Sequence, residues 1–136
     1  MLRRLIYISR SMIGADPKQV EAIVSTSIRR NAPLELTGML WADGESFARV
    51  IEGDPHRLEQ TMDRIRTDRR HLDIEVLLDR SVASRQFGNW SMRRAVDDEA
   101  SAHATTFMIG FAMGERTNLA NRLYEIVLES DRRNLF

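Results

Sequence analysis

The sequence predicts an α+β fold of the ferredoxin-like type, with the order β-α-β-β-α-β, an added fifth strand and one or two C-terminal helices. Two Asp-Pro steps, Asp16-Pro17 and Asp54-Pro55, each mark a helix start that follows an apolar, strand-type run. Between the two helices, a pair of such runs is joined by the turn sequence Asp43-Gly44. This order places both helices on one face of a four-stranded, mainly antiparallel sheet.

The first half of the chain supplies a strand, a helix and a hairpin. Residues 5–8 (LIYI) predict a short buried strand. The first helix begins with an N-cap carboxylate, a first-turn proline and a glutamine at the capping-box position. Its apolar face comprises Val20, Ile23, Val24 and Ile28. Residues 36–41 and 47–51 then predict the two strands of the hairpin.

The second half supplies a helix, two strands and a helical tail. Leu58, Met62 and Ile65 mark the inner face of the second helix, and residues 73–79 predict the fourth strand. Ser91–Val96 is the expected fifth strand, reached through a loop that contains Phe87 and Trp90. Residues 102–113 and 117–130 predict helices that either cover the open sheet face or pack against another subunit.

The expected division is a first domain over residues 1–97 and a helical extension over 98–136. Twenty basic residues balance 20 acidic ones, which disfavours general binding of a nucleic-acid backbone. The absence of cysteine excludes thiolate metal sites, and His56, His71 and His103 are too scattered for a metal site. We see neither a signal peptide nor a membrane span and expect a cytoplasmic protein.

Catalytic motifs are absent, so we do not expect an enzyme. There is no glycine-rich phosphate loop, no H-E-x-x-H pair and no nucleophile beside a base. An acylphosphatase-like hydrolase on the same fold needs a loop that cradles an anion. The loop at residues 10–15 has one glycine and lacks such a pattern.

A set of five spaced motifs does stand out. Tyr7 lies within LIYIS, and Asn31 opens the stretch NAPLELTG. FARVIEG occupies residues 47–53, RIRTDRRH residues 64–71, and RQFGNWSM residues 85–92. In order, spacing and predicted element, these resemble the BLUF family of blue-light sensors that use a flavin. The resemblance covers roughly the first ninety-five residues.

The resemblance implies a role for each matching residue. It places a flavin, FAD by family habit, between the two helices on the sheet face, with Ile23 and Ile65 on either side of its ring system. Asn31 would bind the carbonyl and imide edge of the ring, and Tyr7 would donate an electron to the excited flavin. Trp90 and Met92 would carry the signal onward. Further cofactor contacts are expected from Phe47, Arg49, Arg64, Asp68, Arg70 and His71.

Each of these residues also has a structural interpretation. Ile23 and Ile65 fit a plain core, and Tyr7 fits a buried strand tyrosine. Asn31 fits the left-handed stop of a helix. Residues 69–71 fit a solvated helix end, and Trp90 fits a plug at the sheet edge.

Position 49 departs from the family pattern, which has glutamine there. Strand alternation puts Phe47, Arg49 and Ile51 on one face, so Arg49 points where the glutamine would. Glutamine both donates and accepts hydrogen bonds, whereas arginine only donates and stays charged. We therefore expect an altered photocycle, and flavin binding that is weak or absent is one outcome.

Three outcomes are open for Arg49. It can bind the flavin and favour a reduced, anionic form. It can fill the pocket and exclude flavin, which requires a nearby carboxylate or phosphate. It can also face solvent. Accordingly, the leading function is a flavin-dependent sensor that signals through an unidentified protein partner, with self-association expected. The alternative is a BLUF-like protein without photoactivity, either a flavin-free interaction or regulatory module or a redox-responsive flavin protein.

Overall fold

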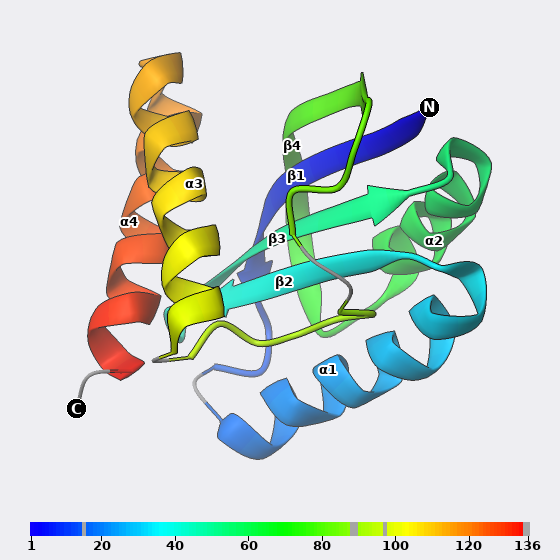
Figure 1. Ribbon diagram of the computed structural model, residues 1–136. Coiled ribbons are helices and arrows are strands. Elements are labelled where there is room, and N and C mark those ends of the chain that lie inside the picture. The colour runs from blue at the N-terminus through cyan, green and yellow to red at the C-terminus, as the bar shows by residue number, and fades with distance from the viewer. Residues whose placement is uncertain (15, 88–89, 97, 135–136) are drawn as a thin grey trace.

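The chain folds into a four-stranded sheet with two helices on each face. The computed structural model describes residues 1–14, 16–87, 90–96 and 98–134 (Figure 1). The elements are β1 (Leu2–Ser11), α1 (Pro17–Asn31), a 3₁₀ turn (Ala32–Leu34), β2 (Thr37–Ala42), β3 (Ser46–Gly53), α2 (Pro55–Thr67), β4 (His71–Val82), α3 (Glu99–Glu115) and α4 (Asn118–Asn134).

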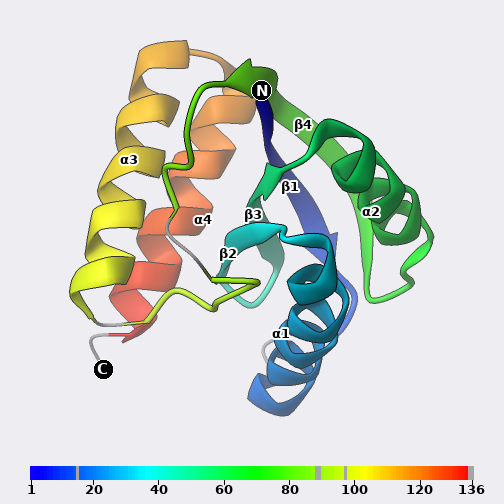
Figure 2. The ribbon, with the colours of Figure 1, turned by 45° about the vertical axis from the view of Figure 1, so that its right-hand side comes forward.

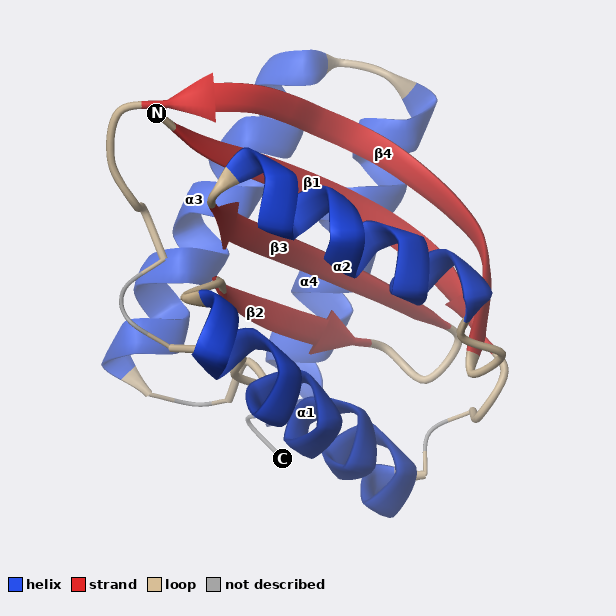
Figure 3. Cartoon of the chain, turned by 90° about the vertical axis from the view of Figure 1, so that its right-hand side faces the viewer, coloured by secondary structure: helices blue, strands red, loops and turns tan. Residues whose placement is uncertain are grey.

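The sheet has the order β2-β3-β1-β4, and every neighbouring pair is antiparallel. Both α1 and α2 lie on one face of it, and α3 and α4 lie on the other (Figures 2 and 3). The ferredoxin-like fold predicted from the sequence is confirmed. Asp16 and Asp54 cap α1 and α2 as expected, since each side chain accepts from backbone N–H groups of the first turn.

Strand alternation divides the interior into two apolar clusters, one on each face of the sheet. In β1, Leu5 and Tyr7 point toward α1 and α2, while Ile6 and Ile8 point toward α3 and α4. On the second face, the indole Nε1 of the fully buried Trp41 donates to Thr105 Oγ1 of α3 at 2.9 Å. The C-terminal helices therefore cover the sheet face that α1 and α2 leave open.

The expected fifth strand takes a reduced form. Residues 90–95 run along β2, but only an isolated parallel bridge forms, between Leu40 and Arg94. Gly38 N donates to Trp90 O and Leu40 N donates to Arg93 O. The two hydrogen bonds are therefore two residues apart in β2 but three residues apart in the segment that runs beside it. This mismatch breaks the regular ladder, as an extra residue does in a bulge.

Ile28 also departs from its predicted place. It was expected on the buried face of α1, but it is 41% exposed, whereas Val20 and Val24 are buried. A helix advances 100° per residue, so Ile28 lies beyond the edge of the narrow stripe that contacts the sheet.

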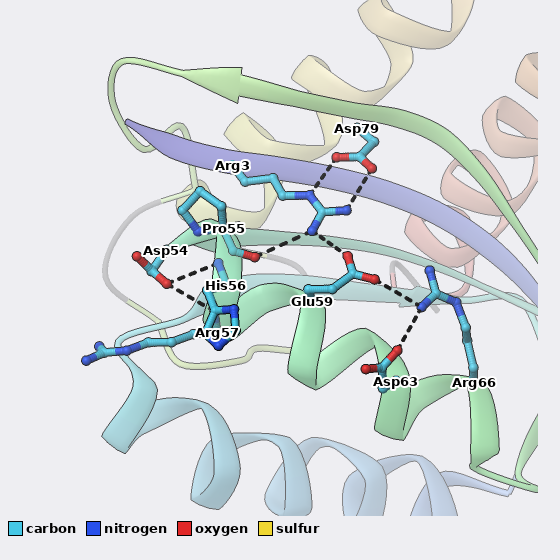
Figure 4. A network of polar contacts seen from close by, with 9 residues as sticks. All are labelled: Arg3, Asp54, Pro55, His56, Arg57, Glu59, Asp63, Arg66 and Asp79. Carbon is cyan, nitrogen blue, oxygen red and sulfur yellow. Dashed lines mark hydrogen bonds and ion pairs between the residues drawn. The ribbon is translucent and has the colours of Figure 1, made fainter.

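Arg3 of the central strand β1 forms charged contacts with the edge strand β4 and with the first half of α2 (Figure 4). Its guanidinium donates to both carboxylate oxygens of Asp79 at 2.7 Å and to Glu59 at 2.6 Å. The hydrogen bond to Asp79 is the main reason that the pKa of Arg3 is raised, and the same bond lowers the pKa of Asp79. No helix in the described part of the chain is long and apolar enough to cross a membrane.

Candidate functional site

A groove runs between α1 and α2 above the sheet, and matching stripes of the two helices form its walls. On α1 the stripe is Ile23, Thr26, Ser27 and Arg30, and on α2 it is Thr61, Arg64 and Ile65, continued by Asp68 at the C-cap. Both follow the spacing i, i+3, i+4 and i+7, which keeps side chains on one side of a helix. These stripes lie beside the positions that pack on the sheet, such as Val20 and Leu58.

The floor of the groove comes from all four strands. Tyr7 of β1, Leu40 of β2, Phe47 and Arg49 of β3, and His71 of β4 line it. Tyr7 stands directly opposite Arg49 in the β1–β3 ladder, and Leu40 stands opposite Arg49 in the β2–β3 ladder. Arg49 is therefore at the centre of the floor.

Two adjoining hollows lie in the groove, with cavity volumes of about 40 and about 20 Å³. Five residues border both hollows: Ile23, Arg49, Ile65, Asp68 and Arg70. The walls combine apolar side chains with hydrogen-bonding groups, as ligand pockets do.

Arg49 is buried in this groove without a counter-charge. Its side chain is on the same face as Tyr7, and the residue is 6% exposed. Nη1 donates to Tyr7 Oη at 3.3 Å, Nη2 donates to Ser27 Oγ at 2.9 Å, and Nε has no acceptor. Among the residues that the structure describes, Arg49 forms no ion pair.

Two of the three outcomes open for Arg49 can now be weighed against this geometry. The solvent-facing placement is wrong, because Arg49 lies inside the groove. Exclusion of flavin by Arg49 required a nearby carboxylate or phosphate as a partner. Among the described residues, Asp68 lines the same hollows, but it pairs with Arg70 and forms no ion pair with Arg49. Binding of an electron-rich ligand is the outcome in which the buried cation gains the acceptors that it lacks.

A second buried arginine shows the usual arrangement. Arg4 is 7% exposed on the opposite face of the sheet, and its Nε donates to Glu52 Oε2 at 2.8 Å. Glu52 also accepts from the backbone N–H groups of Gln86 and Phe87 at 3.0 Å. The glutamate of the FARVIEG motif thus neutralises Arg4 and anchors the following loop, and it is not available to Arg49.

His71 is neutral in this setting. Burial is the main cause that lowers its pKa, and the charges of Arg49 and Arg70 lower it further. The ring Nε2 lies 2.9 Å from the carbonyl oxygen of Ile65, which can only accept, so Nε2 carries the proton. Nδ1 then accepts from Ser9 Oγ at 2.8 Å. These two bonds fix the ring at the edge of the groove.

Asp68 and Arg70 form a local pair at the mouth of the groove, with Arg70 Nη2 and Asp68 Oδ2 2.7 Å apart. Burial acts to raise the pKa of Asp68, but the hydrogen bonds and charge of Arg70 outweigh it and hold that pKa below its usual value. Within the described part of the chain, the side chain of Arg64 donates only to Thr61 Oγ1, at 3.4 Å. The side chain of Arg30 has neither an ion pair nor a hydrogen bond there. The groove therefore carries an excess of positive charge.

Trp90 and Met92 lie on opposite sides of the sheet edge. Met92 is buried in the cluster beneath α1 and α2, whereas Trp90 packs against the cluster on the α3 side. The guanidinium of Arg93 stacks over the Trp90 ring at 5.2 Å and forms an ion pair with Asp98, whose Oδ1 accepts from Ser101 N at the start of α3. Trp90 is thus linked to the first turn of α3.

Asn31 is the last residue of α1 and is buried, with a right-handed φ of −79°. Its interpretation as a left-handed helix stop is therefore wrong; Glu35, after the 3₁₀ turn, has that conformation. Asn31 Nδ2 donates to Ser91 O at 2.7 Å, which ties the groove to the segment between Trp90 and Met92.

The structure brings together the ten residues that the sequence assigns to cofactor contact. Each lines at least one of the two hollows: Tyr7, Ile23, Asn31, Phe47, Arg49, Arg64, Ile65, Asp68, Arg70 and His71. Trp90 and Met92 line neither. The sequence analysis missed Ser27 and Thr61, which the i, i+4 relation to Ile23 and Ile65 could have indicated. Ala15, Gly88, Asn89 and Asp97 lie outside the described residues.

These features fit a flavin. Apolar side chains face each other across the groove where a flat ring would lie, and the unsatisfied Arg49 Nε is a donor without an acceptor. The residues that would hold the group are Ile23 and Ile65 on its faces, with Arg49 and Asn31 at its polar edge.

Comparison with known proteins gives the same answer. Residues 2–93 match the family model "BLUF: Sensors of blue-light using FAD". The chain is 34% identical over 92 residues to the blue light- and temperature-regulated antirepressor BluF of Escherichia coli (strain K12), covering 68% of this chain and 23% of that protein. The chain thus spans about a quarter of the length of this relative.

Two solved structures extend the comparison. Klebsiella pneumoniae BlrP1, in a structure with FMN and cyclic diGMP, is 35% identical, with a TM-score of 0.64 over 69% of this chain and 25% of that one. The BLUF region of BlrP1 is 29% identical, with a TM-score of 0.65 over 95% of this chain and 88% of that one. The groove geometry, the family model and these relatives agree that the chain belongs to the BLUF family of flavin-dependent blue-light sensors.

Proposed function

We propose that this chain binds a flavin, FAD by family habit, in the groove between α1 and α2 and acts as a light-responsive sensor with an altered photocycle. The observation that supports this most is that the ten residues implied by the family resemblance all line two adjoining hollows. These residues come from five different elements of the fold and from the loop between α2 and β4, so their proximity is not a consequence of sequence neighbourhood.

The flavin supplies light absorption and electron acceptance, and the chain supplies its setting. Ile23 and Ile65 would exclude water from the faces of the ring. Asn31 would couple the ring to the Ser91 backbone, because its side-chain amide already donates a hydrogen bond to Ser91 O. Neutral His71 and the paired Asp68 and Arg70 would line the remaining edge without adding net charge.

Arg49 alters what Tyr7 can do. A glutamine beside a tyrosine hydroxyl can accept its proton or donate to it, but a guanidinium can only donate. In this structure the Tyr7 oxygen accepts from Arg49 Nη1, so the hydroxyl proton must point elsewhere. The tyrosine therefore has no proton acceptor at position 49, and we expect the light-driven exchange of hydrogen bonds to be impaired.

We propose that the output is protein–protein contact and not catalysis by this domain. In BluF and in the BlrP1 structure with FMN and cyclic diGMP, the region similar to this chain makes up about a quarter of a longer chain. The link from Trp90 through Arg93 to Asp98 gives the sheet edge a route to α3. A downstream partner at α3 and α4, and self-association of the chain, belong to this proposal.

An absorption spectrum tests the proposal. The protein is purified with excess FAD, and separately with FMN, in dim light, and its spectrum is recorded before and during blue illumination. We expect a bound-flavin band in the wild type, and a reversible shift to longer wavelength in Arg49→Gln that is absent or much weaker in the wild type. Arg80→Gln, an exposed change outside the groove, should match the wild type.

A flavin-free interaction module is the second candidate. It is favoured by the place of Arg49 between the two hollows, where the side chain takes up space on the floor. Absence of a flavin band in the wild type after reconstitution, together with its presence in Arg49→Gln, would support this candidate over the first.

A further inference from the structure

Arg49 is a buried charge in the groove that forms no ion pair with any of the described residues. Arg49 and Arg4 occupy neighbouring central strands and are almost equally buried, at 6% and 7% exposure. The fold gives Arg4 the carboxylate of Glu52 at 2.8 Å, but it gives Arg49 only two neutral hydroxyl groups. A buried charge without a partner is strongly unfavourable, so such residues are kept where a ligand supplies the partner.

The surroundings of Arg49 do not offset its positive charge. His71 is close enough for the charge of Arg49 to lower its pKa, and Asp68 is already paired with Arg70. At the mouth, Arg30 and Arg64 have no carboxylate partner among the described residues. The groove as a whole is thus complementary to a ligand with negative charge.

We propose that Arg49 makes this groove select the reduced, anionic flavin over the oxidised, neutral one, so that the domain responds to the redox state of its flavin. This inference rests on the proposed flavin site. Charge placed near the ring is one of the means by which a protein tunes a flavin. A fixed, pre-oriented guanidinium stabilises a negative charge that appears only on reduction.

The electron balance is as follows. The oxidised ring takes up two electrons and one proton, and it keeps one negative charge that Arg49 neutralises. The electrons come from a reduced nicotinamide through a flavin reductase in the cell, or from dithionite in the test. Dioxygen reverses the change: the reduced anion, one dioxygen and one proton give oxidised flavin and hydrogen peroxide.

The test is the midpoint potential of bound FAD, measured by dye equilibration in the dark for the wild type, Arg49→Gln, Arg49→Lys and Arg80→Gln. We expect the wild type to bind the reduced form, relative to the oxidised form, at least tenfold better than Arg49→Gln does. That ratio is a potential about 30 mV more positive for a two-electron couple. Arg49→Lys retains the charge and should keep most of the difference, and Arg80→Gln should equal the wild type.

The pH dependence of the potential gives a second measure. Uptake of one proton with two electrons changes the wild-type potential by about 30 mV per pH unit, because each pH unit then changes the apparent equilibrium constant of the two-electron couple tenfold. A slope of about 60 mV per pH unit corresponds to two protons and a neutral reduced ring, and it would overturn the proposal.

The outcomes separate the two proposals. If no variant binds FAD in either redox state, the flavin site itself is wrong, and this inference fails with it. If FAD binds but the wild type and Arg49→Gln have equal potentials, the flavin site stands and the redox role of Arg49 is wrong. A potential that follows the charge at position 49, with Arg80→Gln unchanged, supports the inference.

Discussion

Replacement of Arg49 by methionine should stabilise the flavin-free protein, although it removes a buried side chain that makes two hydrogen bonds. The bonds to Tyr7 Oη and Ser27 Oγ are 3.3 and 2.9 Å long. Hydrogen bonds to charged groups contribute about 1.5–3 kcal/mol each when well formed. Against them stand the desolvation of the guanidinium, several kcal/mol, and the unsatisfied Nε, about 1–3 kcal/mol.

The balance favours the neutral side chain. Replacing buried charged groups by apolar ones of similar volume is often neutral or stabilising by about 1–4 kcal/mol. The two hydroxyl groups that lose their donor border open hollows and can bind water instead. We therefore expect Arg49→Met to raise the free energy of unfolding by about 1–2 kcal/mol.

Arg4→Met is the matched comparison, and its effect should have the opposite sign. It leaves Glu52, which is fully buried, with two backbone donors but no counter-charge. Removing one partner of a buried pair costs about 3–5 kcal/mol. The two variants should therefore differ by roughly 4–7 kcal/mol in the free energy of unfolding, a difference built from the same two estimates.

The assay is urea unfolding of the flavin-free protein, followed by circular dichroism, with the midpoint and slope reported separately. An equal loss of stability in Arg49→Met and Arg4→Met would refute the reasoning. It would mean that Arg49 is neutralised within the folded chain, and the case for an anionic ligand would lose its basis.

Three further predictions address other parts of the fold. Because the folded pKa of His71 is depressed, its stabilising effect is complete above the unfolded value of about 6.5 and is lost as pH falls below it toward the folded pKa, so urea midpoints should drop on acidification in the wild type and less in His71→Gln. Arg93→Ala should cost about 1 kcal/mol and increase acrylamide quenching of Trp90, because it uncovers one face of the Trp90 ring. The change in quenching can be assigned to Trp90 because Trp41 is fully buried, and unchanged quenching would contradict the proposed stacking. Gly38→Ala should cost about 2–3 kcal/mol, since the new Cβ would lie 2.2 Å from Val50 O, whereas Gly110→Ala, with open space in α3, should gain about 0.5–1 kcal/mol; similar thermal shifts for both would contradict this packing.

The elements of the fold could be predicted because their signals are local. The Asp-Pro caps fixed the starts of α1 and α2, and period-two alternation put Phe47, Arg49 and Ile51 on the face of Tyr7. The groove residues followed from the resemblance to the BLUF family, which rested on the order and spacing of five motifs. Ser27 and Thr61 were missed because they belong to none of the matched family positions, although their i, i+4 relation to Ile23 and Ile65 places them on the same helix faces.

Other features depended on contacts between distant segments. The fifth strand was expected from Ser91–Val96, but its pairing with β2 is out of step by one residue, and a single segment does not reveal that mismatch. The exposure of Ile28 depended on how narrow the contact of α1 with the sheet is. Whether α3 and α4 cover this sheet or a partner was likewise open until Trp41 was seen to contact Thr105.

The sequence by itself determined the order of the elements, the face on which Arg49 lies and the resemblance to a flavin-binding family, since strand and helix periods follow from backbone geometry. Only the tertiary structure decided which charges meet. It joined Glu52 to Arg4 on one face of the sheet and left Arg49 without a carboxylate among the described residues on the other. Charge pairing falls off within a few ångströms, so it depends on strand register and helix placement, which no local pattern specifies.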